Sequence, residues 1–380
     1  MVDTTPVVVE ALRTPQGKNG GVYEDVRSED LVIPLVNETL TGTGLSGAEV
    51  DDFMLGCAQQ RDEQDNNVAR IVSLLSDLGE SVPGTTINRW CASSAQAITS
   101  AANAIQVGQR DAILAGGVES MTRVPFPDAG ADTIHPRISE VYDQDRLRMG
   151  MTAETVAENY DISREAQDEF AVRSHERAAE ATDSGRFDDE IVPIDTPDGT
   201  VEEDEGIRRD TSVEALADLP TVFKDDGTVT PGNASQISDG ASMTLLTSRE
   251  FADEHGLEVL AEVGNHNVAG VDPREMGIGP IPAVEGLLER ANRNIDEYDL
   301  VDLNEAFASQ CLYCQQQLGV DDGRYNVNGG AIAIGHPLGA TGARIPVTLI
   351  HEMGKRDAER GIATECVGFG QGAAIEFSRP

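Results

Sequence analysis

The 380-residue sequence predicts an α/β fold of two similar halves, with a long insertion in the first half. The first observation is an internal repeat, in which strand-like and helix-like segments recur in the same order later in the chain. The second is a composition with 39% hydrophobic residues and 38 glycines, which is typical of globular α/β proteins with tight turns. The third is a stretch from about 119 to 236 that has no counterpart in the second half.

The repeat consists of three elements that share one order in both halves. They are a strand, a small-residue turn that opens a helix, and a strand that ends in glycine. The matching segments are 50–56 with 298–304, 91–95 with 339–343, and 112–117 with 363–368. Each pair alone is weak, but the shared order predicts two copies of one βα unit.

A fourth pair locates the insertion. Residues 372–377 follow the glycine strand almost at once, whereas their counterpart, 240–245, comes much later. We therefore expect 1–118 and 237–256 to form the first half, 257–380 the second, and 119–236 an inserted lid.

Local patterns predict the contents of this insertion. One helix is expected from Thr152 to Tyr160, and a second starts at Ser163 and runs past His175. The strongly acidic stretch 188–210 predicts a solvated hairpin or loop.

The charge of the chain is extreme. With 67 acidic and 28 basic residues the formal net charge is −39, and Lys18, Lys224 and Lys355 are the only lysines. Such a surface repels itself at ordinary salt, so we expect a salt-adapted cytoplasmic protein of the kind made by halophilic archaea. An acidic patch for a basic partner is the alternative, but the acidic residues are spread over the whole chain. The charge argues against binding of nucleic acid or of an anionic membrane surface.

Targeting signals and disulfide patterns are also missing from the sequence. The opening residues lack a basic region with a long apolar core, and no run approaches the ~18 apolar residues of a membrane helix. Five cysteines, an odd and sparse set, predict a reducing compartment and no disulfide framework.

Cys91 is the first candidate for chemistry. It lies where a short apolar approach meets the Ala/Ser-rich run Ala92-Ser93-Ser94-Ala95, which predicts a strand-to-helix turn. Free backbone N–H groups and the helix dipole at such a turn favour a thiolate. From this stretch alone, a buried structural cysteine is an equally good interpretation.

Three further residues are expected to converge with Cys91. His336 is held between Gly335 and Pro337, just before the turn that corresponds to Cys91 in the repeat, and a rigid imidazole suits thiol activation. Cys366 ends a neighbouring strand, and Asn304 ends another, where ligands bind in α/β sheets.

The remaining cysteines and histidines are expected to be structural. Cys311 and Cys314 have a redox or half-zinc spacing, but they lie in a predicted helix with no second cysteine pair, so we favour helix packing. Cys57 is predicted to be a buried strand-end residue. The other histidines lack ligand spacing, so no metal site is expected; they are His135, His175, His255, His266 and His351.

Over nearly its whole length the sequence resembles the thiolase family of acetyl-CoA acetyltransferases and 3-ketoacyl-CoA thiolases. The resemblance lies in a series of motifs, several of them highly specific: Arg13-Thr14-Pro15, the Cys91 turn, Met149-Gly150-Met151-Thr152-Ala153-Glu154, Gly232-Asn233-Ala234-Ser235, Asn304-Glu305-Ala306-Phe307, the His336 loop and the Cys366 strand. It implies a five-layered αβαβα fold of two βαβαβαββ halves with an inserted lid domain.

The resemblance also implies catalytic roles. Cys91 would be the nucleophile that takes the acyl group, His336 would activate it and help bind the thioester oxygen, and Cys366 would be the acid/base. Asn304 would hold a water in the first oxyanion site, and the N–H groups of Cys91 and Gly368 would form the second.

Coenzyme A enters this interpretation as a substrate, with no permanently bound cofactor, and the assembly would be a homodimer or homotetramer. The residues implied around CoA are Met149, Ser235, Met276 and Phe307 at the pantetheine arm and Arg208 at a phosphate. From sequence, Met276 and Phe307 are equally well explained as core residues.

The function expected is acetyl transfer between acetyl-CoA molecules and the reverse thiolysis of 3-ketoacyl-CoA. The alternatives are a longer-chain 3-ketoacyl-CoA thiolase of fatty acid degradation and a non-catalytic, acyl-CoA-binding subunit. Three departures from the family pattern motivate them. Arg148 stands where acetoacetyl-specific members commonly have His, Ser94 replaces a frequent Gly, and Phe369 interrupts a run of glycines, where it would narrow the pocket or shift Gly368.

Overall fold

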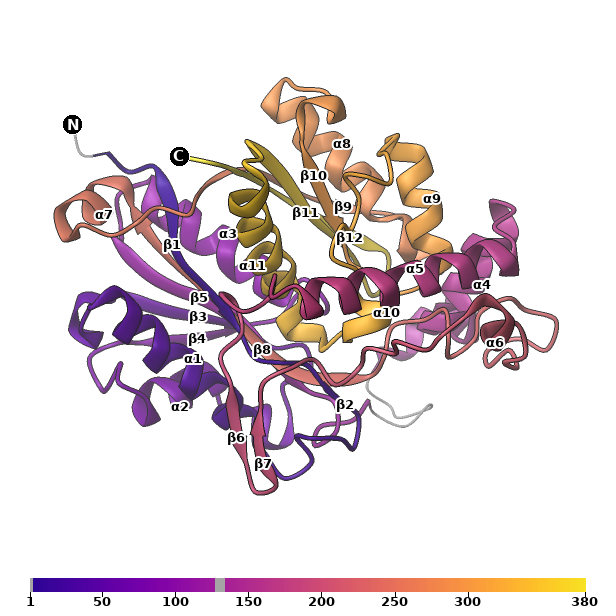
Figure 1. The fold of residues 1–380 in the computed structure, drawn as a ribbon, viewed down its shortest axis with the longest axis horizontal. Helices are drawn as coiled ribbons and strands as arrows, with labels where there is room; N and C mark the ends of the chain where they lie inside the picture. The colour runs from indigo at the N-terminus through magenta and orange to yellow at the C-terminus, as the bar shows by residue number, and fades with distance from the viewer. Residues whose placement is uncertain (1–2, 127–133) are drawn as a thin grey trace.

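The computed structural model describes residues 3–126 and 134–380, so 1–2 and part of the predicted insertion, 127–133, lie outside the described residues (Figure 1). The strands are β1 (Pro6–Arg13), β2 (Gly17–Lys18), β3 (Asp52–Gly56), β4 (Gly84–Ile87), β5 (Ala112–Ser120), β6 (Ile194–Thr196), β7 (Gly199–Val201), β8 (Ser238–Ser248), β9 (Ala261–Gly270), β10 (Leu300–Leu303), β11 (Arg360–Val367) and β12 (Gln371–Ser378). The helices are α1 (Ser28–Thr43), α2 (Val68–Leu75), α3 (Ser93–Gln106), α4 (Met149–Asn159), α5 (Arg164–Asp183), α6 (Val213–Ala217), α7 (Arg249–His255), α8 (Pro280–Ala291), α9 (Ala308–Leu318), α10 (Ala331–Ile334) and α11 (Leu338–Arg356).

The strands form two half-sheets that meet at one short seam. The first half-sheet has the order β4-β3-β5-β8-β1, and the second has the order β9-β12-β11-β10. Only the ends of β1 and β9 pair across the seam, at Val7 with Glu262 and Val8 with Ala261. In each half-sheet the inner strands are buried on both faces, which explains their nearly continuous apolar sequence.

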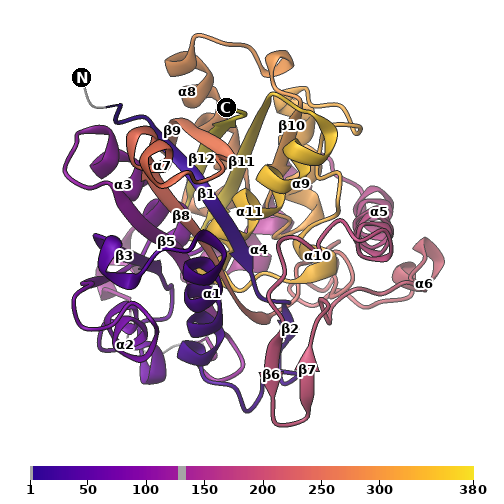
Figure 2. The same cartoon turned by 60° about the vertical axis from the view of Figure 1, so that its left-hand side comes forward.

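Helices cover both sheets and separate them. Helices α1 and α2 pack on the outer face of the first sheet, α8 lies on the outer face of the second with α9 beside it, and α3 and α11 lie between the sheets (Figures 1 and 2). Three apolar clusters correspond to these interfaces. The result is the five-layered αβαβα arrangement that the sequence predicts.

The internal repeat is confirmed as a structural repeat. β3 is parallel to β5 in the first half as β10 is to β11 in the second, and β5 is antiparallel to β8 as β11 is to β12. Helix α3 corresponds to α11, so the turns that open these helices face one another across the middle layer.

Glycines allow this close approach of the two halves. A Cβ at Gly117 would collide with the Gly339 carbonyl oxygen, and one at Gly342 would lie 2.5 Å from the Ala95 nitrogen. Gly117 in β5 and Gly342 in the turn that opens α11 are therefore required by backbone contact.

The chain between β5 and β8 carries α4, α5, α6 and the β6–β7 hairpin. Both predicted helices are present: α4 begins at Met149, three residues before the predicted start, and the Ser163 hydroxyl caps α5 by accepting from the Ala166 N–H. α5 packs against α9 and α10 of the second half, so this part of the chain lies against both halves.

The prediction that 188–210 is solvated is wrong at four positions, Glu190, Ile194, Asp204 and Gly206, and two of these are acidic. Glu190 and Asp204 are buried, and their carboxylates bind the fully buried Arg13 guanidinium, with Nε–Oε1 and Nη1–Oδ1 distances of 2.6 and 2.8 Å. A buried guanidinium requires counter-charges, and this acidic stretch supplies them. No helix in the described ranges is long and apolar enough to cross a membrane.

Candidate active site

Cys91 lies in a tight turn between β4 and α3. The preceding residue, Trp90, has a positive φ of 48°, and α3 begins at Ser93. The sulfur is almost completely buried among Ala58, Met121 and Leu338. The small residues that follow Cys91 let this turn lie under the second half of the chain.

The thiolate expected from the sequence is not favoured in the free protein. Burial and, second, the nearby Glu365 carboxyl raise the pKa of Cys91 to about 12. The backbone N–H groups of Gly368 and of Cys91 itself act in the opposite direction but are outweighed. Cys91 therefore rests as a thiol, which needs a base to become a nucleophile.

His336 can supply that base because its tautomer is determined by a neighbour. Its Nδ1 lies 2.7 Å from the Thr341 hydroxyl oxygen, and that hydroxyl donates to the Pro337 carbonyl at 2.9 Å. The hydroxyl must therefore accept from His336, which assigns the ring proton to Nδ1 and leaves Nε2 free to accept. Burial, with a smaller contribution from Arg344, lowers the pKa of His336 to about 3, so the ring is neutral.

Asn304 lies beside this imidazole at the end of β10. Its Nδ2 is 3.3 Å from His336 Nε2, and the whole side chain is buried. Its Oδ1 has no hydrogen-bond partner among the described residues. The amide and the imidazole thus present polar atoms to a common point.

Cys366 joins the site from the end of β11. Its side chain is 1% exposed, and burial, followed by the proximity of Cys91, raises its pKa well above the ordinary value. The two thiols, one from the turn before α3 and one from the end of β11, are therefore neighbours. Gly368 follows two residues later, with its N–H directed at the Cys91 sulfur.

The structure brings the five predicted catalytic residues into two contacting groups: Cys91 lies beside Cys366 and Gly368, and Asn304 lies beside His336. Leu338, two residues after His336, packs on Cys91. The electrostatics of the five residues are those of two buried thiols, one neutral imidazole and a set of N–H donors, with the buried Glu365 carboxyl directly before Cys366 on β11. This arrangement can move a proton from sulfur to nitrogen and stabilise an oxyanion beside the sulfur.

Four of the five predicted CoA-binding residues adjoin Cys366. Met276 and Phe307 share its apolar cluster, with Met149 packed at the edge. Ser235 donates its N–H to the Ala306 carbonyl at 2.9 Å and so lies against the same segment as Phe307. Met276 and Phe307 therefore pack in a core and border the candidate site at the same time.

Arg208 lies farther out, on the surface of the chain between β7 and α6. Its backbone N–H donates to His175 Nδ1 at 3.1 Å, and the preceding Ile207 packs on α10, just before the His336 loop. Its exposed guanidinium makes no ion pair within the described ranges.

The sequence did not predict two residues that position the candidate site. One is Thr341, whose signal would have been a hydroxyl one helical turn after Pro337. The other is Glu119, a fully buried carboxylate that accepts hydrogen bonds from Ala58 N, Gln59 N, Gln64 Nε2 and Gly339 N at 2.9, 3.1, 2.7 and 2.9 Å. Glu119 ties the end of β5 to the start of α11, and nothing local in sequence marks that contact.

The other cysteines behave as predicted. Cys311 and Cys314 are fully buried in α9, where the Cys314 thiol lies 3.4 Å from the Gly277 carbonyl oxygen, and Cys57 is buried directly after β3. In the part of the chain that the structure describes, no three His, Cys, Asp or Glu side chains are grouped to hold a metal.

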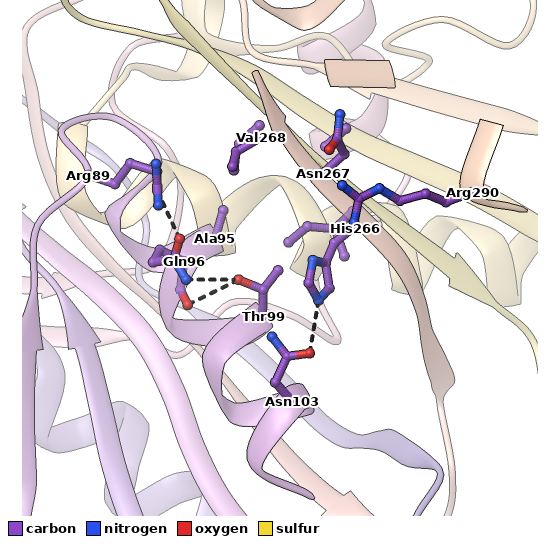
Figure 3. Close-up of a pocket in the computed structure, with 12 residues that line it drawn as sticks. Arg89, Ala95, Gln96, Thr99, Asn103, His266, Asn267, Val268 and Arg290 are labelled. Atoms are coloured by element: carbon purple, nitrogen blue, oxygen red, sulfur yellow. Dashed lines mark hydrogen bonds between the residues drawn. The ribbon is translucent and has the colours of Figure 1, made fainter. Parts of the chain in front are cut away.

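A separate cavity of about 250 Å³ lies behind the Cys91 turn, between α3 and β9 (Figure 3). Its lining is polar, with Arg89 bonded to Gln96 at 2.8 Å and His266 Nε2 at 3.2 Å from Asn103 Oδ1. None of the candidate catalytic residues lines it.

Comparison with known proteins gives matches over nearly the whole chain. The family model described as "Thiolase, N-terminal domain" matches residues 6–250, and "Thiolase, C-terminal domain" matches 257–379. The chain is 45% identical to a beta-ketoadipyl-CoA thiolase of Pseudomonas aeruginosa, with 98% of each chain covered. It is 46% identical to a 3-ketoacyl-CoA thiolase of Vibrio vulnificus, covering 98% of this chain and 99% of the relative.

Two solved structures agree with this match. The Bacillus anthracis acetyl-CoA acetyltransferase superimposes with a TM-score of 0.91 at 42% identity over 99% of both chains. Human mitochondrial 3-ketoacyl-CoA thiolase in complex with CoA superimposes with a TM-score of 0.92 at 37% identity, covering 100% of this chain and 99% of that one.

Proposed function

The chain belongs to the thiolase family, and on that premise we propose that it transfers acyl groups to and from coenzyme A through an acyl-Cys91 intermediate. As a thiolase it is an acyltransferase acting on acyl-CoA substrates. Two observations support the proposed intermediate: the Cys91 and Cys366 thiols are neighbours, and Asn304 contacts His336, two residues before Leu338, which packs on Cys91.

In the first half-reaction, the Cys91 thiol passes its proton to His336 Nε2 as the sulfur attacks the thioester carbonyl of acyl-CoA. The tetrahedral oxyanion is stabilised by donors at the site, each worth ~3 kcal/mol of barrier. The bond from carbon to the CoA sulfur then breaks, the imidazolium returns its proton to the departing thiolate, and acyl-Cys91 remains.

In the second half-reaction, Cys366 gives its proton to His336 Nε2 and, as thiolate, removes a proton from the methyl group of a second acetyl-CoA. The carbanion attacks the acyl-Cys91 carbonyl, which forms the new carbon–carbon bond and releases Cys91 as thiolate. The Cys91 thiolate then takes the proton from the His336 imidazolium, and Cys366 keeps the proton from the methyl group. Because the proximity of Cys91 raises the pKa of Cys366, acylation of Cys91 favours ionisation of Cys366 at the step that needs it. Thiolysis is the same path reversed.

For CoA we propose that Met149, Ser235, Met276 and Phe307 contact the pantetheine arm and that Arg208 contacts a phosphate. The apolar cluster that contains Cys366 supports this assignment, because the reacting sulfur must end beside it. In this proposal the chain from 119 to 236 is the lid that supplies Met149, Arg208 and Ser235.

For substrate we propose acetyl-CoA and acetoacetyl-CoA, with longer 3-ketoacyl-CoA thioesters as the second candidate. The names of the relatives support both, since they include an acetyl-CoA acetyltransferase and 3-ketoacyl-CoA thiolases. A substrate series from acetoacetyl-CoA to longer 3-ketoacyl-CoA thioesters in molar KCl separates the two.

We further propose a homodimer, or a homotetramer built from it, in a salt-rich cytoplasm. β4 is an edge strand of the described sheet, and α2, which packs against β4, ends in the exposed Leu74 and Leu75. A free edge beside apolar side chains favours pairing with a second copy. Light scattering in molar KCl tests it, and a monomeric mass would contradict it.

The deciding experiment for the proposed function is mass spectrometry after incubation with acetyl-CoA in molar KCl. Wild type should gain one acetyl group on the peptide containing Cys91, and Cys91→Ala should gain none there. Cys311→Ala, which removes a buried thiol outside the site, should label like wild type. Binding of CoA with no acetyl transfer and no thiolysis would instead indicate the non-catalytic alternative.

A further inference from the structure

We propose that Trp90 and Phe369 form one aromatic wall beside Cys91, which restricts the acyl group on that sulfur to short, unbranched chains. This inference rests on the proposed function, because it assigns a substrate class to the same site. It names two residues, one from each half, as determinants of acyl specificity.

The backbone at both positions is unusual. Nine non-glycine residues in the described ranges have a positive φ, and seven of them are Asn or Asp, which tolerate it. The other two are Trp90, with φ of 48°, and Phe369, with φ of 61°. A bulky side chain in this region is strained, and such strain persists only where the surroundings impose it, often at functional sites.

The two strained residues are in contact. Their ring centroids are 5.7 Å apart with an interplanar angle of 50°, within the range of favourable aromatic pairs. Trp90 comes from the turn before α3, and Phe369 from the turn between β11 and β12. The pair therefore bridges the two catalytic turns of the two halves.

The pair also borders the reacting sulfur. Trp90 directly precedes Cys91 and packs on the apolar cluster around it. Phe369 directly follows Gly368, and a Cβ placed at Gly368 would lie 3.9 Å from Trp90 Cγ and 3.0 Å from Met149 Cε. Gly368, whose N–H is one of the proposed oxyanion donors, thus lies between aromatic and methionine side chains.

Rigid walls near a reacting carbonyl discriminate by size. An acyl group on Cys91 whose oxygen points at the proposed oxyanion donors must extend past the aromatic pair, so added methylenes or branches meet the rings. Phe369 is 37% exposed, so the wall stands at the mouth of the site rather than in the core. One methylene in a tight pocket typically changes kcat/KM by about 10- to 200-fold.

The test compares kcat/KM for acetoacetyl-CoA with that for 3-ketooctanoyl-CoA in molar KCl. Phe369→Gly should shift this ratio toward the longer substrate by about 10-fold or more. The variant should fold, because φ near 61° suits glycine. Phe369→Leu, which keeps the Cβ and loses the ring, should give a smaller shift, and Trp90→Leu a shift in the same direction.

A double variant checks that the rings act together. Loss of either ring opens the same wall. The change in the kcat/KM ratio for the double variant, Phe369→Gly with Trp90→Leu, should therefore be smaller than the product of the two single changes. If wild type is acetylated at Cys91 but both single variants keep the wild-type ratio of the two kcat/KM values, this inference is overturned and the proposed function stands. Absence of acetylation in wild type would overturn the proposed function and the wall with it.

Discussion

Thr341 Oγ1 lies 2.7 Å from Nδ1 of His336 and donates its own proton to the Pro337 carbonyl. Replacing Thr341 by Val removes the hydroxyl that accepts the Nδ1 proton of His336. The ring proton is then no longer held on Nδ1, so Nε2 is no longer kept free to accept. Once His336 holds the proton from Cys91, its hydrogen bond to Thr341 is one to a charged group, which is worth about 1.5–3 kcal/mol. Without that bond, kcat for thiolysis should fall by about 10- to 150-fold. Steady-state kinetics with acetoacetyl-CoA measures the effect.

The matched control for this prediction is Thr341→Ser, which keeps the hydroxyl and should keep kcat within a few-fold of wild type. Equal losses in Val and Ser variants would mean that the methyl group matters by packing, and that the tautomer argument is wrong.

Glu119 is expected to matter for both stability and rate. Glu119→Gln replaces one carboxylate oxygen with an NH₂ group that faces backbone N–H donors, so the free energy of unfolding should fall by about 1–3 kcal/mol. Since one of those donors, Gly339 N, opens the helix after His336, kcat should fall as well. Urea unfolding and kinetics are compared with Glu24→Gln, an exposed control, which should change neither.

Acid stability should depend on His336. Its pKa is about 3 when folded, against ~6.5 in an unfolded chain, so between these values the unfolded state binds more protons. The contribution of His336 is complete above about pH 6.5 and is lost as the pH falls through that window, at up to ~1.4 kcal/mol per pH unit. His175, with a pKa lowered to about 4 by burial, adds to the slope.

Urea unfolding from pH 7 to pH 4 tests this. His336→Gln should show a shallower loss of stability than wild type, and His135→Gln, which changes an exposed histidine, should show the wild-type slope. Identical slopes in all three proteins would count against the buried, neutral imidazole.

Salt dependence follows from the net charge of −39. Counterions screen repulsion between the carboxylates, so Tm should rise by about 10 °C or more between 0.1 and 2 M KCl. Sucrose at matched water activity serves as the control, because it screens no charge. A Tm independent of KCl would contradict the salt-adapted interpretation.

The architecture could be predicted because its signals are local. Segments 112–117 and 363–368, which match in the repeat, form corresponding strands of the two halves. They could be recognised because a few consecutive residues are enough to indicate a strand that ends in glycine. The helix that starts after Ser163 was likewise visible in its start signal, whereas α4 begins three residues before the predicted Thr152. The burial of Glu190 and Asp204 was not, because their partner, Arg13, is far away in sequence.

Residue type and position in the repeat predicted that Cys91, His336, Cys366 and Asn304 form one group, and the structure pairs Cys91 with Cys366 and Asn304 with His336. The pKa values of the two thiols could not be predicted from the sequence. They depend on burial, and burial depends on which residues of the other half pack against each turn. The helix-dipole argument predicted a thiolate at Cys91, and desolvation outweighs it.

The sequence by itself therefore determined which elements form, how they repeat and which side chains can carry chemistry. Only the tertiary structure decided which nitrogen of His336 is free, that Glu119 joins the halves and that Trp90 meets Phe369. The physical reason is range. Periodicity and turn preferences act over a few residues, whereas hydrogen-bond direction, desolvation and aromatic contact depend on atoms that only folding brings within a few ångströms.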